Sequence, residues 1–86
     1  MSNEKKPESR IKGKTIVITG VLSKTRSQFA ADIRKKGGII AGSVTSKTDY
    51  LIVGRNFGTV KVAAAFKHGT FSVTEEEFLE ILNSEE

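Results

Sequence analysis

The chain of 86 residues contains no cysteine and no tryptophan, and only one histidine and one proline. Without cysteine it can form neither a disulfide nor a thiolate nucleophile, and a single histidine excludes a zinc site built from histidine and cysteine. Its apolar runs, such as Thr15 to Gly20, are far too short to cross a membrane, and the first residues lack the apolar segment of a secretory signal. We therefore expect one small intracellular domain with no membrane segment, metal or cofactor, located in the cytoplasm or nucleoid of a bacterium or the nucleus of a eukaryote.

The charges that are present are divided unevenly along the chain, whose net charge is +4. Residues 15–73 carry nine lysines and arginines against two aspartates, whereas residues 74–86 carry six glutamates and no basic residue. A basic surface attracts polyanions and accelerates their encounter, which makes nucleic acid one class of partner to consider. A well-solvated surface without a polyanionic partner is the alternative.

The first ten residues, MSNEKKPESR, contain almost no apolar side chain and include the one proline. Such a segment cannot bury enough apolar surface to offset the conformational entropy that is lost on ordering. We expect residues 1–10 to be a disordered basic tail or linker, and residues 11–84 to form the folded domain.

Four short apolar segments have the composition of β-strands. The first, Thr15 to Thr19, is β-branched throughout and has no polar alternation at its centre, which is typical of a strand covered on both faces in a parallel sheet. The other three strands are expected at residues 39–41, 50–53 and 70–73.

The first helix is expected from Thr25 to Lys36, where apolar side chains recur on one stripe opposite basic ones. Either Ser23 or Thr25 can cap its N-terminus, and Gly37 can end it. The apolar stripe consists of Phe29, Ala30 and Ile33.

Two further helices are expected. One runs from about Thr59 to Lys67 and ends before Gly69. The other begins after Thr74 with three glutamates, which favour the positive end of the helix dipole. The side chains expected to face inward are Val62, Ala65 and Phe66 in the second helix, and Phe78, Ile81 and Leu82 in the third.

The order of these elements is βαββαβα, and the connections are long enough for parallel strand pairing. The sequence therefore predicts an α/β fold with a four-stranded parallel sheet flanked by three helices.

From Ile11 to about Leu82 the chain resembles a BRCT domain. The segments that carry the resemblance are GKTIVITG at 13–20, TR at 25–26, GG at 37–38, SVTSKTDYLIVG at 43–54, Lys61, HGT at 68–70 and EEEFLEIL at 75–82. They are most similar to the subgroup found in bacterial NAD-dependent DNA ligases and in the large subunit of the eukaryotic clamp loader. The resemblance implies a non-catalytic module that engages DNA, in the clamp loader at 5′-phosphorylated ends.

Several positions depart from the family pattern. Phe78 stands where many BRCT domains have tryptophan, a change that the ligase-like subgroup shares. Ile39 replaces a lysine that is common in the subgroup, and Val62 to Ala65 replace charged residues, so these positions cannot contact a phosphate. Phe57, in the loop before the second helix, is either a platform for a base or sugar or an anchor for its loop.

The sheet edge at which the strands end is the expected binding site, because ligands of open parallel sheets bind there and the N-termini of the following helices point there. Thr19 offers a hydroxyl, and Gly20 has no Cβ to keep an anion from its backbone N–H. Arg26 opens the first helix and Lys61 the second, so two cations and two positive helix ends can converge on one phosphate. The matching residues of the family form such a pocket.

Lys24, Lys47 and Arg55 lie in loops that we expect to flank the same edge. Each candidate also has a structural interpretation: Thr19 and Gly20 can simply end a strand, the cations can be solvated, and Lys47 can shape its turn. His68 has no nucleophile or carboxylate partner, and consecutive helical glutamates do not provide Mg²⁺ geometry, so we expect no enzyme activity.

Three functions follow from this site. The first is a DNA-binding module of replication or repair that recognises a 5′-phosphate at a DNA end or nick. The second is a reader of phosphoserine or phosphothreonine peptides that uses the same pocket. The third is a protein-interaction module that needs no phosphate and uses Phe57 or the exposed helices.

Overall fold

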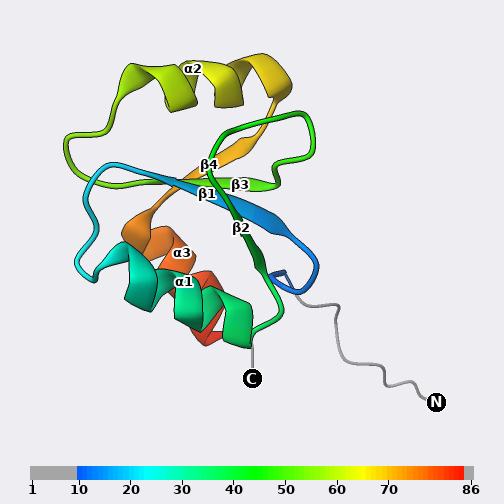
Figure 1. Ribbon diagram of the computed structural model, residues 1–86, viewed down its shortest axis with the longest axis vertical. Helices are drawn as coiled ribbons and strands as arrows, with labels where there is room; N and C mark the ends of the chain where they lie inside the picture. Colours follow the sequence, from blue (N-terminus) through cyan, green and yellow to red (C-terminus); the bar gives the residue numbers. More distant parts are fainter. Residues whose placement is uncertain (1–9, 85–86) are drawn as a thin grey trace.

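The structure is a computed structural model that describes residues 10–84 of the chain (Figure 1). The predicted disordered tail, residues 1–10, lies outside the described residues except for Arg10. The elements are β1 (Thr15–Thr19), α1 (Arg26–Lys35), β2 (Ile39–Ala41), β3 (Tyr50–Val53), α2 (Thr59–His68), β4 (Phe71–Thr74) and α3 (Glu75–Asn83).

The four strands form one sheet in the order β2-β1-β3-β4, and all three strand pairs are parallel. Helices α1 and α3 cover one face of this sheet and α2 covers the other (Figure 1). The predicted α/β fold with a four-stranded parallel sheet and three helices is confirmed. The central strand β1 pairs on both sides and is covered on both faces, which explains its uninterrupted apolar sequence.

The core has two parts because successive side chains of a strand point to opposite faces. Along β1, Ile16 and Ile18 belong to the cluster under α1 and α3, and Val17 belongs to the smaller cluster under α2. The larger cluster contains Phe29 of α1 and Phe78 of α3, both fully buried, with ring centroids 6.0 Å apart. The α1/α3 face therefore contains most of the buried apolar surface.

Two of the helices begin with a capping box. The hydroxyl of Thr25 accepts a hydrogen bond from the N–H of Gln28 (3.1 Å), and the hydroxyl of Thr74 accepts one from the N–H of Glu77 (3.1 Å). Of the two residues that could cap α1, the structure uses Thr25, and Ser23 has a different role. Because the glutamine and glutamate side chains bind back to the cap residues, the starts of α1 and α3 are fixed locally.

The prediction that Phe66 faces inward is wrong, because its side chain is 89% exposed. Helix α2 meets the sheet through Ala65, which is fully buried, with Val62 packed beside it. Successive helical residues are about 100° apart, so Phe66 is turned away from the sheet when Ala65 points directly at it. The fourth strand begins at Phe71, one residue later than expected.

Candidate phosphate-binding site

The carboxyl ends of β1 and β3 lie side by side at one edge of the sheet. From this edge the chain continues from β1 into α1 on one face, and from β3 into α2 on the other face (Figure 1). The connections thus leave in opposite directions from neighbouring strands, which is the arrangement at which open α/β sheets bind ligands.

Hydrogen bonds hold the two segments that leave β1 and β3 together. The N–H of Gly54 donates to the carbonyl of Thr19 (2.8 Å). Beyond it, Val21 and Arg55 exchange two backbone hydrogen bonds of 2.8 and 2.9 Å, which form a short antiparallel bridge. Arg55 is therefore placed next to Gly20, at the predicted edge.

Gly20 is required by this close crossing. Its φ is +84°, and a Cβ at this position would lie 2.7 Å from the carbonyl oxygen of Arg55. The backbone of Arg55 therefore occupies the space that the missing side chain leaves, and contact of an anion with the Gly20 N–H stays a prediction. The glycine positions the site by letting the two segments meet.

A hollow of about 450 Å³ lies along the connection between β1 and α1. It contains three of the predicted site residues, Gly20, Lys24 and Arg26. The residues that line it are Gly20, Val21, Leu22, Ser23, Lys24, Thr25 and Arg26. The hollow can therefore receive a group at the start of α1, beside the exposed Arg26.

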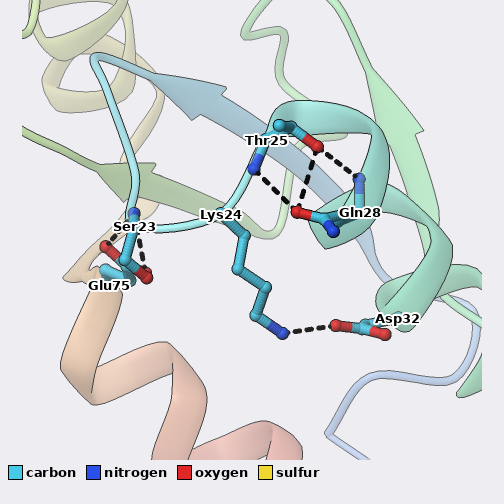
Figure 2. Close-up of polar contacts among 6 residues, drawn as sticks. All are labelled: Ser23, Lys24, Thr25, Gln28, Asp32 and Glu75. Carbon is cyan, nitrogen blue, oxygen red and sulfur yellow. Dashed lines mark hydrogen bonds and ion pairs between the residues drawn. The ribbon is translucent and has the colours of Figure 1, made fainter.

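Lys24 is paired within the domain. Its Nζ lies 2.6 Å from Oδ2 of Asp32 (Figure 2). The same Nζ lies 5.5 Å from the ring centroid of Phe29. The hydrogen bond from Lys24 holds the pKa of Asp32 below its ordinary value of 3.8. Part of the positive charge of Lys24 is thus balanced before any ligand arrives, which distinguishes it from Arg26.

Ser23 is tied to the start of α3 by Glu75. The backbone N–H of Ser23 donates to both carboxylate oxygens (3.0 and 3.1 Å), and its hydroxyl donates to Oε2 (Figure 2). No local sequence pattern indicates this contact, because the two residues are 52 positions apart. Glu75 therefore anchors the middle of the loop that lines the hollow.

Thr19 and Lys61 lie on the α2 side of the sheet. Thr19 follows Val17 by two residues, so it points to the same face, and its side chain is buried. Lys61 is half-buried in the first turn of α2. Arg26 occupies the first turn of α1 on the opposite face. The structure thus brings the starts of both helices to one edge, with Thr19 and Gly20 between them.

The helix ends at this edge differ in charge. Neither α1 nor α2 has an acidic residue in its first turn, and the cap of α2, Gly58, makes no side-chain hydrogen bond. Helix α3 begins at the same edge but carries Glu75, Glu76 and Glu77 in its first turn. A positive dipole end without carboxylates favours an anion at α1 and α2, and α2 also lacks a side-chain cap, whereas carboxylates already occupy the start of α3.

Lys47 is not at this edge, and the prediction that its loop flanks the other cations is wrong. The connection from β2 to β3 must return to the opposite edge of the sheet, because the two strands run in the same direction. Asp49, two residues after Lys47, donates its N–H to the carbonyl of Thr15 at the beginning of β1 (2.8 Å). The N–H of Lys47 donates to the hydroxyl of Thr45 (3.1 Å), so its backbone takes part in the turn.

Residues 10–84, the described part of the chain, provide neither a metal-binding cluster nor a membrane-spanning helix. This part of the chain has no group of three or more histidine or acidic side chains that could hold a metal ion. None of its helices is long and apolar enough to cross a membrane.

Comparison with known families identifies the fold. The family model described as "BRCA1 C Terminus (BRCT) domain" matches residues 6–82, which is nearly the whole chain. The chain belongs to the BRCT family. The resemblance inferred from the segments around Gly20, Gly37 and Gly54 is therefore confirmed.

The BRCT domain is also similar to parts of bacterial DNA ligases. It is 47% identical over 83 residues to a DNA ligase of Helicobacter pylori (strain Shi470), a match that covers 95% of this chain and 12% of the ligase. It is 45% identical over 73 residues to a DNA ligase of Aquifex aeolicus (strain VF5), covering 84% of this chain and 10% of the ligase. The chain thus spans only 10 to 12% of the length of these curated relatives, and the predicted likeness to the ligase subgroup is confirmed.

Proposed function

We propose that this BRCT domain is a non-catalytic DNA-binding module that recognises a 5′-phosphate at a DNA end or nick. The observation that supports the proposal is that α1 and α2, whose first turns contain Arg26 and Lys61, both begin at the sheet edge where Gly20 follows β1, and neither has an acidic residue in its first turn. A terminal phosphate monoester carries more charge and more acceptor oxygens than an internal phosphodiester. Such a group suits two cations and exposed helix N–H groups.

The charges at the edge support this assignment. Lys24 forms an ion pair with Asp32, but in the described part of the chain no acidic side chain lies within ion-pair distance of Arg26, Arg55 or Lys61. Cations without an internal partner keep their full attraction for an external anion. Arg55 is next to the crossing of the two segments, where it can contact the backbone beside the terminal phosphate.

The similarity to bacterial DNA ligases supports DNA as the source of the phosphate. If the domain is joined to a ligase, we propose that ligation occurs outside residues 10–84, and that the protein acts in DNA replication or repair inside the cell, in the cytoplasm or nucleoid of a bacterium. A phosphopeptide would offer the same phosphate chemistry, so it serves as the competing ligand in the test below.

Substitution of Lys61 tests the proposal. Lys61→Ala should remove most of the difference in affinity between a duplex with a recessed 5′-phosphate and the same duplex with a 5′-hydroxyl. The loss of one charged hydrogen bond corresponds to about 1 to 3 kcal/mol. Lys67→Ala, an exposed lysine in the last turn of the same helix, is the matched control and should keep the difference. An unchanged preference in Lys61→Ala, or a preference for a phosphopeptide over phosphorylated DNA, would contradict the proposal.

A phosphate-independent protein-interaction function has one specific observation in its favour. Helix α2 exposes Phe66 and Val60, which are 89% and 80% accessible, on a short helix that is otherwise rich in alanine. Exposed aromatic and aliphatic side chains are typical of protein interfaces. This function predicts that Phe66→Ala abolishes partner binding and leaves the 5′-phosphate preference intact.

A further inference from the structure

A second hollow lies between α1 and the edge strand β2, with a volume of about 210 Å³. It has an arginine at each end of its helical wall, Arg26 and Arg34, and apolar side chains between them. Ile18, Ala30, Ile40 and Ala41 supply the apolar lining, and Ser27 adds one hydroxyl. We call this hollow the α1–β2 groove.

The spacing along α1 explains the alternation of charge and apolar surface. Arg26, Ala30 and Arg34 are four residues apart in turn, so they form one row along the helix. Eight residues correspond to about 12 Å along a helix axis. The row therefore places two guanidinium groups on one line, with a small apolar residue between them.

The groove continues from the candidate phosphate site. Arg26 lines both the hollow at the start of α1 and the α1–β2 groove. Within residues 10–84, which the structure describes, β2 pairs with no strand other than β1, so it forms an open edge of the sheet. A ligand whose end is bound beside Gly20 can therefore extend past Arg26 and along α1 without crossing another strand.

The alternation of guanidinium, apolar surface and guanidinium matches a sugar–phosphate backbone. Arginine binds phosphate oxygens through planar, paired donors, and the carbon-rich face of a deoxyribose can pack on alanine and isoleucine. An acidic peptide could also place carboxylates on the two arginines. The continuity with the terminal-phosphate site favours DNA, because a strand presents further phosphates at regular intervals after its 5′ end.

We propose that the α1–β2 groove binds the sugar–phosphate backbone of the nucleotides that follow the 5′-phosphate, with Arg34 on an internal phosphate. The proposal rests on the proposed function, since that function places the 5′ end beside Arg26. The proposal also gives the bound DNA strand a direction. From its phosphorylated 5′ end, the strand runs from the start of α1 toward the C-terminal end of that helix. The domain then reads the terminal phosphate together with the strand that carries it.

The test combines protein and DNA substitutions in an anisotropy titration of the intact chain. Arg34→Ala should weaken binding to 5′-phosphorylated DNA about tenfold, as expected for one lost contact between charged groups. It should retain the preference for phosphate over hydroxyl. Lys35→Ala, the exposed neighbour that does not line the groove, is the control and should bind nearly as the unchanged protein does.

A neutral methylphosphonate placed in turn at each of the first internal linkages then locates the contact. At one linkage the methylphosphonate should weaken DNA binding by the unchanged protein and cause no further loss of DNA binding in Arg34→Ala. Equal binding by Arg34→Ala and the unchanged protein, with the 5′-phosphate preference intact, would overturn the groove assignment alone. Absence of that preference in the unchanged protein would overturn the proposed function and the strand direction with it. A loss of acidic-peptide binding without a loss of DNA binding would make the groove a peptide site and overturn the proposal.

Discussion

Glu75 holds Ser23 through both of its carboxylate oxygens, although the two residues lie 52 positions apart in the chain. The contact joins the first turn of α3 to the loop that lines the candidate phosphate site (Figure 2). The acidic end of the chain therefore contributes to a basic site by fixing the shape of its loop. The acceptor is a carboxylate, and hydrogen bonds to charged groups are stronger than those between neutral groups.

Glu75→Ala should lower the free energy of unfolding by about 1 to 2 kcal/mol, because the Ser23 N–H and hydroxyl lose a charged acceptor. Urea denaturation measures the change. Glu76→Ala removes the same charge from the same helical turn without touching Ser23, so it serves as the control for the dipole effect. Equal destabilisation by the two substitutions would show that the Ser23 contact contributes nothing to stability.

Gly20→Ala should destabilise the domain by about 2 kcal/mol or more, because the backbone has a φ of +84° and the new Cβ meets the carbonyl oxygen of Arg55 at 2.7 Å. Gly42→Ala provides the comparison, since a Cβ there meets no atom within 4 Å. We expect it to change stability by no more than about 0.5 kcal/mol. Thermal unfolding of both variants is sufficient, and a Gly20→Ala protein as stable as Gly42→Ala would contradict the close crossing.

The ion pair between Lys24 and Asp32 predicts a specific dependence of stability on pH. Lys24 lowers the pKa of Asp32 in the folded state from the ordinary value of 3.8, so the pair stabilises the fold above that value. This contribution is lost as the pH falls through the lowered pKa, where Asp32 takes up a proton. The difference in unfolding free energy between the unchanged protein and Asp32→Asn should therefore be present at neutral pH and shrink in acid. A difference that is independent of pH would rule out the pair as its cause.

Phe66→Ala should leave the stability of the domain nearly unchanged, within about 0.5 kcal/mol, because the ring is exposed. Phe78→Ala, by contrast, removes a fully buried ring and should cost about 3 to 5 kcal/mol. Chemical denaturation of the two variants compares them directly. A large loss of stability in Phe66→Ala would mean that the ring is packed against the domain after all.

The strands and the layers of the fold could be predicted from local sequence. The β-branched run from Thr15 to Thr19 indicates a strand buried on both faces, and Gly37 and Gly69, which have positive φ, mark the ends of two helices. The positions of Arg26 and Lys61 at the carboxyl edge also follow from the order of elements, because each directly follows a parallel strand and its connecting loop.

The two predictions that were wrong, for Phe66 and Lys47, concern positions that tertiary packing determines. Phe66 and Ala65 are both apolar, and only the orientation of α2 on the sheet determines which of them is buried. Lys47 is close in sequence to β3, but the edge of the sheet at which it lies depends on the path of the loop between two parallel strands. The contact of Ser23 with Glu75 joins distant segments and has no local pattern. Arg34 could have been found, because it follows Arg26 and Ala30 at helical spacing.

Recognition of a 5′-phosphate is tested most directly by a fluorescence-anisotropy titration of the intact chain with two forms of one duplex that differ only at a recessed 5′ end. One form carries a 5′-phosphate and the other a 5′-hydroxyl, and each is measured at two salt concentrations. A site for a 5′-phosphate predicts tighter binding of the phosphorylated form, and a decrease in affinity with salt whose log–log slope is about −3 to −4 if three or four phosphates are neutralised. Equal affinity for the two forms would contradict it.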